Sequence, residues 1–91
     1  MWQRADNQTE VFCIEVPPSR IVLLQGLFES YDGIGVVKTF DHVKGIVCII
    51  TSSSMREECT QLLEASSNLI PWREFPLEED LELLFEYQNV G

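Results

Sequence analysis

The chain has 91 residues, of which 45% are hydrophobic, so it is long enough for one hydrophobic core and too short for a second domain. Its net charge of −9 argues against nucleic-acid binding, because an acidic surface repels the phosphate backbone. No apolar run is long enough to cross a bilayer, and no apolar signal region follows Met1. We therefore expect a soluble cytoplasmic protein that contacts neither nucleic acid nor membrane.

The three cysteines, Cys13, Cys48 and Cys59, each lie within an apolar pattern. Their number is odd, and no two of them have the spacing of metal ligands. A buried thiol commonly packs as a small hydrophobic side chain. We therefore predict no disulfide framework, no metal site and no cofactor.

Residues 1–8 are polar and lack periodicity, so we predict a flexible leader in which only Trp2 is suited to hold it to the domain. Residues 9–16 alternate in the manner of a strand. One face of this strand carries Phe12, Ile14 and Val16, and the other carries Val11, Cys13 and Glu15. Pro17 and Pro18 end the strand, because proline cannot continue the hydrogen-bond ladder.

A first helix is predicted from Pro18 onward, since proline is tolerated in the first turn. Its apolar face comprises Ile21, Leu24, Phe28 and Tyr31. Residues 34–40 predict the next strand, and Lys38 within it is typical of the edge of a sheet. Residues 41–45 predict a short hairpin connection.

Residues 45–51 are apolar on both faces, which predicts a central strand covered at least partly on both sides. Ser54 and Glu57 fit a capping box at the start of a second helix. The buried face of that helix is expected to comprise Met55, Cys59, Leu62, Leu63, Ser66 and Leu69. Residues 70–75 predict a fourth strand, and Pro71 marks it as an edge.

This order of elements predicts an α+β fold over residues 9–75, a ferredoxin-like βαββαβ sandwich with a four-stranded antiparallel sheet in the order 4-1-3-2. Both helices of such a fold cover the same face of the sheet. On the opposite face, which we call the outer face, the central strand presents either Ile46, Cys48 and Ile50 or Val47, Ile49 and Thr51. We expect the first set, together with Val11 and Cys13, to form an interface. We consider three candidates that would cover this face: a second copy, the C-terminal segment or another protein.

Residues 76–91 predict an additional acidic, amphipathic C-terminal helix. Pro76 stands at its start, and three carboxylates follow in the first turn, where the helix dipole favours negative charge. Its apolar stripe comprises Leu77, Leu81, Leu84 and Phe85. So short a helix is marginal alone in water, so we expect it to lie on the sheet or on a partner.

No residue pattern indicates catalysis. His42, the single histidine, lies in the hairpin loop between Asp41 and Lys44 without a second ligand at local spacing, which is typical of a solvated turn residue. Residues 52–54 are three serines at a helix start, where backbone N–H groups can bind an anion, but capping already explains Ser54. No glycine-rich phosphate loop and no nucleophile elbow occurs in the sequence. We therefore expect a protein that is not an enzyme.

The element order and residues 16–22 together resemble ACT domains, which are small regulatory modules of the same topology. Pro18 stands at the family's proline position, and Ser19 stands where that family has glycine. The resemblance implies pairing through the sheet and an amino acid or similar ligand near this loop, at Pro18, Ser19 and Arg20. Residues 16–21, together with residues 33–39, also look like a family of short, stand-alone bacterial proteins of unknown function.

We therefore expect a non-enzymatic regulatory or ligand-sensing domain that forms a homodimer through its sheet. The alternative is a protein–protein interaction module, which would use the acidic C-terminal helix or the open sheet face.

Overall fold

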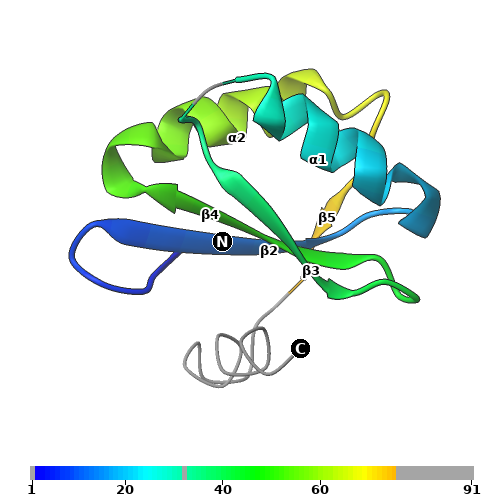
Figure 1. Cartoon of the computed structure of the whole chain (residues 1–91), viewed down its shortest axis with the longest axis horizontal. Coiled ribbons are helices and arrows are strands. Elements are labelled where there is room, and N and C mark those ends of the chain that lie inside the picture. The colour runs from blue at the N-terminus through cyan, green and yellow to red at the C-terminus, as the bar shows by residue number, and fades with distance from the viewer. Residues whose placement is uncertain (1, 32, 76–91) are drawn as a thin grey trace.

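The computed structural model describes residues 2–31 and 33–75. Two helices lie on one face of an antiparallel sheet (Figure 1). The strands are β1 (Gln3–Arg4), β2 (Thr9–Glu15), β3 (Val36–Asp41), β4 (Ile46–Ser52) and β5 (Arg73–Glu74). The helices are α1 (Ile21–Glu29) and α2 (Arg56–Ala65), preceded by the 3-10 turns η1 (Pro18–Arg20) and η2 (Ser53–Met55), respectively. The predicted α+β class, with two helices and an antiparallel sheet, is confirmed.

Strands β2 and β4 form the centre of the sheet. They pair in the antiparallel direction along their whole lengths, with Cys13 opposite Cys48. β3 pairs with the other edge of β4, and both β1 and β5 pair with the other edge of β2. The path through the sheet is β1-β2-β4-β3, with β5 beside β2. Among the described residues the sheet thus has five strands where the sequence predicts four, and the strand predicted over residues 70–75 is reduced to β5.

The inner face of the sheet and the two helices enclose the main hydrophobic core. Alternate residues of β2 and β4 point toward the helices, because side chains along a strand alternate between faces. The buried members of this cluster are Phe12, Ile14, Val16, Ile21, Leu24, Phe28, Ile34, Val47, Ile49, Cys59, Leu63 and Ile70. Burial of this set is the main driving force for the fold.

A second, smaller cluster lies on the outer face. It comprises Val11, Cys13 and Cys48, against which Phe40, Ile50 and Phe75 pack. Val11 is 0% exposed, Cys13 and Cys48 are each 3% exposed, and Ile46 is also buried. Of the five residues expected on the outer face, all but Ile46 thus belong to this cluster, and all but Ile50 are buried.

The N-terminal residues are attached to the domain. The sequence predicts no element before residue 9, but β1 pairs with β2 through Gln3 opposite Val11. The Trp2 ring lies 5.2 Å from the Phe12 ring, and its indole N–H donates a 2.9 Å hydrogen bond to Thr60 Oγ1 on α2. Trp2 therefore fastens the start of the chain to the core, as its position in the sequence suggests.

The starts and ends of the helices differ from the predicted boundaries. α1 ends at Glu29, so Tyr31 lies beyond the apolar stripe and is 51% exposed. α2 ends at Ala65, so Leu69 is likewise 55% exposed. The predicted capping box is absent, because α2 begins after η2 without a side-chain cap and the Ser54 hydroxyl lies 3.1 Å from Ser52 Oγ instead.

The predicted acidic helix, with Leu77, Leu81, Leu84 and Phe85, lies outside the described residues. Within residues 2–31 and 33–75, no helix is long and apolar enough to cross a membrane.

Candidate functional site

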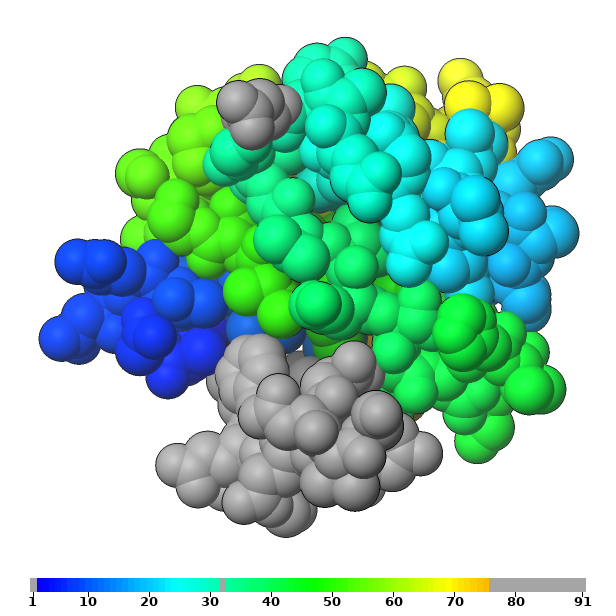
Figure 2. Space-filling model, in the orientation of Figure 1, coloured from blue at the N-terminus to red at the C-terminus, as the bar shows by residue number. Residues whose placement is uncertain are grey.

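A cleft of about 400 Å³ lies at the end of the sheet where β2 finishes. Three segments that are distant in the sequence form its walls: the end of β2 with the following prolines, the β3–β4 hairpin, and the segment that leads into β5 and includes its first residue. The lining residues are Glu15, Val16, Pro17, Pro18, Lys44, Pro71, Trp72 and Arg73. In the space-filling view the hairpin loop and the η1 turn adjoin each other at this end of the molecule (Figure 2).

The first wall of the cleft is the segment in which β2 ends and the chain turns into η1. Pro17 takes an extended conformation with φ −56° and ψ 131°, and Pro18 starts η1. Proline suits both positions, because its fixed φ matches them and its missing N–H is not needed there. The Arg20 N–H closes the turn by donating to the Pro17 carbonyl oxygen at 2.8 Å.

The second wall is the hairpin loop that brings Lys44 to the cleft. The Asp41 carboxylate accepts hydrogen bonds from the N–H groups of Val43 and Lys44, each at 3.0 Å. Gly45 has φ +77°, a left-handed conformation that favours glycine. The Val16 N–H donates to the Gly45 carbonyl oxygen at 2.8 Å, so the loop is fastened directly to the end of β2.

The third wall is apolar and rigidly held. The Trp72 indole N–H donates to the Leu63 carbonyl oxygen of α2 at 3.0 Å. Its ring meets the Phe12 ring edge-to-face, with centroids 5.6 Å apart and an interplanar angle of 86°. Both contacts fix the indole, so it offers the cleft a preformed apolar surface beside Pro71.

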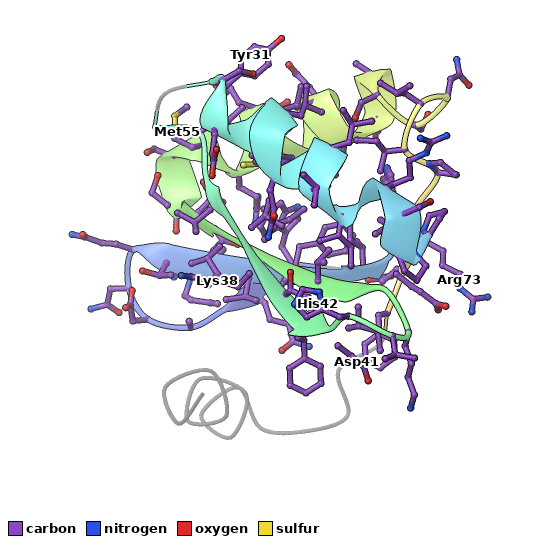
Figure 3. All side chains as sticks on the ribbon, turned by 45° about the vertical axis from the view of Figure 1, so that its right-hand side comes forward. Tyr31, Lys38, Asp41, His42, Met55 and Arg73 are labelled. Carbon is purple, nitrogen blue, oxygen red and sulfur yellow. The ribbon has the colours of Figure 1, made fainter. Side chains whose placement is uncertain are left out.

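Charges of both signs line the cleft. Arg73 donates two hydrogen bonds to the same Glu15 oxygen, from Nε at 2.9 Å and from Nη2 at 2.7 Å. The side chains of Arg73 and Glu15 are 77% and 33% exposed, respectively, so solvent screens the pair and it adds little to the stability of the fold. Figure 3 shows Arg73 at the same end of the molecule as the hairpin residue Asp41. The cleft thus presents a carboxylate, a guanidinium and the Lys44 ammonium around apolar walls.

Of the three residues predicted to bind a ligand, the structure places one at the cleft. Pro18 lines it, whereas Ser19 and Arg20 are exposed on η1 and do not. Sequence reasoning missed Glu15, Lys44 and Arg73. The only local signal for Arg73 is the charge that it places within the predicted fourth strand, and such a charge indicates the edge of a sheet rather than a binding site.

The other candidate residues for chemistry are not gathered into a site. His42 is exposed in the hairpin loop, and Asp41 beside it is engaged by the loop's own N–H groups. In the part of the chain that the structure describes, no group of three or more metal-ligating side chains occurs. A second hollow of about 440 Å³ has no charged side chain in its lining, which comprises Gln8, Thr9, Gly33, Gly35, Val36, Ile50, Thr51 and Ser52.

An ion pair between a buried carboxylate and a half-exposed guanidinium lies at the opposite end of β2. Glu10 is 4% exposed and accepts a 3.0 Å hydrogen bond from Arg56 on α2. Burial raises the pKa of Glu10, but the neighbouring Ser53 and Arg56 side chains and the charges of Arg56 and Arg4 outweigh it, so the net pKa is lowered. This pair ties β2 to the start of α2 and has the features of a structural contact.

All three cysteines are free and buried, as expected of small hydrophobic side chains. Cys59 lies in the inner core, where its thiol donates to the Ile34 carbonyl oxygen at 2.8 Å and burial raises its pKa. Cys13 and Cys48 lie in the outer cluster.

These features describe a small α+β domain with a charged, open cleft at a corner of its sheet. The family model described as "Domain of unknown function (DUF4911)" matches residues 14–70, which is more than half of the chain, and the chain belongs to this family. The match begins within β2 and runs through both helices to Ile70. Comparison with curated proteins and with solved structures gives no match.

Proposed function

We propose that this protein is a non-enzymatic regulatory domain that binds a small zwitterionic ligand, an amino acid or a close analogue, in the cleft. The observation that carries the proposal is the juxtaposition of Glu15 with Lys44 and Arg73 around a preformed apolar wall. A guanidinium and an ammonium suit a ligand carboxylate, while a carboxylate suits a ligand ammonium. The indole of Trp72 and the prolines suit an apolar side chain of the ligand.

The arrangement of strands supports the ferredoxin-like topology that we propose for this domain. β5, β2, β4 and β3 lie in the spatial sequence expected of the predicted order 4-1-3-2, if β1 is regarded as an addition to the edge of β2. The cleft includes Pro18, in the loop where the resemblance to ACT domains implies a ligand. Ser19 leaves a ligand less room at the backbone than glycine would. We therefore propose that the ligand contacts the side chains of the cleft rather than the backbone of this loop.

A thermal-stabilisation screen of the full chain tests the proposal. The probes are the standard amino acids, with simple carboxylates and amines as half-ligands that carry only one of the two charges. A ligand at one hundred times its dissociation constant adds about 2.7 kcal/mol to the free energy of unfolding. For a domain of this size that corresponds to a rise of roughly 10 °C or more in melting temperature. If no amino acid raises it, while the protein unfolds cooperatively, the proposal is wrong.

A homodimer is the second candidate, and one observation favours it. Val36 on the edge strand β3 is 51% exposed and pairs with Ile50, so both side chains lie on the outer face. Because Val11, Cys13 and Cys48 are almost inaccessible already, a second copy would dock on this β3 side of the face. The predicted role of the C-terminal stripe in binding a partner protein stays a prediction from the sequence.

Sedimentation equilibrium of the wild-type chain and of Val36→Glu tests the dimer. We expect dissociation of the dimer in the variant, because pairing would bury the new carboxylate. Val43→Glu is the matched control, since Val43 is 87% exposed in the hairpin loop. A wild-type chain that is monomeric at all concentrations contradicts this candidate.

A further inference from the structure

Cys13 and Cys48 face each other directly across the two central strands. Two backbone hydrogen bonds just beyond the paired strands show whether the two cysteines form a hydrogen-bonded or a non-hydrogen-bonded pair. Val16 N–H donates to Gly45 O, and Ser53 N–H donates to Gln8 O, so the hydrogen-bonded pairs of β2 and β4 fall on the even-numbered residues of β2. Cys13 and Cys48 therefore form a non-hydrogen-bonded pair, in which opposing side chains approach most closely.

The geometry of such a pair allows a disulfide. Cα atoms of non-hydrogen-bonded partners lie about 4.5 Å apart, which is within the Cα separation of roughly 4.4–6.8 Å that a disulfide spans. The two thiols also interact with each other: contact with Cys13 is the main cause that raises the pKa of Cys48, followed by burial. Cys59 is separated from both by the sheet, since it belongs to the inner cluster.

We propose that Cys13 and Cys48 form a reversible dithiol–disulfide pair that a peroxide oxidises. One thiol, as its thiolate, attacks a peroxide oxygen; the O–O bond breaks, giving a sulfenic acid and one water. The sulfur of the second thiol then attacks the sulfenic sulfur, the S–S bond forms, the S–O bond breaks and a second water leaves. The two thiols lose two electrons and two protons in total, and the peroxide is reduced to two waters.

The surroundings of the pair determine its rate and reversibility. Each cysteine is only 3% exposed, so the oxidant must reach the pair through local opening of the outer face, and the reaction is slow compared with that of an exposed thiol. The Cα separation of about 4.5 Å that is typical of non-hydrogen-bonded pairs lies at the lower end of the disulfide range. Strained disulfides are readily reduced, so dithiothreitol should restore both thiols.

Treating the native full chain with hydrogen peroxide and mapping its peptides without reduction tests the proposal. We expect a loss of about 2 Da in the intact mass, because two thiol hydrogens are removed. The mapped peptides should join Cys13 to Cys48, while Cys59 should remain alkylatable after unfolding. Dithiothreitol should reverse the loss of mass.

The wild-type map decides the outcome without any variant. A product in which Cys59 is joined, a cross-link between two chains, or sulfinic acid at Cys13 or Cys48 without the disulfide each overturns the proposal. Cys59→Ser should still lose the two hydrogens, whereas Cys48→Ser should not. The far-UV spectrum of Cys48→Ser establishes that the variant is folded before this comparison is made.

Discussion

Gly45 lies against the end of β2 so closely that a Cβ atom on it would collide with the carbonyl oxygen of Val16. Its φ of +77° adds a second constraint. We predict that Gly45→Ala lowers the free energy of unfolding by at least about 2 kcal/mol, because both a left-handed alanine and a backbone collision must be accommodated. Urea denaturation measures the loss.

Gly33 provides a matched control for this prediction. It has the same φ of +77°, but a Cβ atom on it would contact no neighbouring group within 4 Å. Gly33→Ala should cost only about 1 kcal/mol, for the backbone conformation alone. Equal losses in the two variants would show that the collision at Val16 contributes nothing.

The attachment of the N-terminal residues through Trp2 is testable in the same way. Trp2→Phe keeps a ring beside Phe12 but removes the donor to Thr60 Oγ1, so we expect a loss of about 1 kcal/mol. Trp2→Ala also removes the packing and should cost more, on the order of 2–3 kcal/mol. If Trp2→Ala unfolds at the same urea concentration as the wild type, the leader predicted from the sequence is the better description.

The elements with strong periodicity are the ones that the sequence predicts well. Alternation in β2 separates Phe12 and Ile14 from Val11 and Cys13, and the structure places these pairs in different clusters. β1 has two residues and is held by pairing with Val11, so no local sequence pattern predicts it. Ser54 and Glu57 are the opposite case. The capping-box motif is present in the sequence, but a 3-10 turn precedes α2 and the side-chain cap does not form.

The cleft is harder to predict, because it depends on contacts between distant segments. Glu15 and Arg73 are far apart in the chain and meet because β5 pairs with the end of β2. Lys44 reaches the cleft through the hydrogen bond between Gly45 and Val16. Among the residues predicted to bind a ligand, only Pro18 lines the cleft, and its local signal is its position in the loop after the first predicted strand.

Adjacent leucines on α1 test which face of the helix holds the core. Leu24 is 0% exposed and Leu23 is 40% exposed. Leu24→Ala should lower the free energy of unfolding by about 2–5 kcal/mol, through lost burial and the cavity left behind. Leu23→Ala should cost less than about 1 kcal/mol. Similar losses measured in urea would place the helix in a different rotation about its axis.

Glu10 should make the fold sensitive to acid. Its pKa is lower in the folded protein than the ordinary value of 4.5, so its contribution to stability is present above that pH and is lost as the pH falls through the folded pKa. We expect the melting temperature of Glu10→Gln to fall less steeply than that of the wild type below about pH 4.5. Identical pH profiles for the two proteins would contradict the prediction.

Substitutions in the cleft test the proposed ligand site independently of folding. Lys44→Ala and Arg73→Ala should each weaken binding of an amino acid by about ten-fold or more, because each removes a charge-assisted hydrogen bond to the ligand carboxylate. Neither should lower the melting temperature of the free protein appreciably, since both side chains are exposed. Arg20→Ala removes the same charge from η1, outside the cleft, and should leave binding unchanged. Isothermal titration measures the affinities; a weaker ligand in Arg20→Ala and an unchanged one in Lys44→Ala and Arg73→Ala would place the site on η1, where the resemblance to ACT domains implies it.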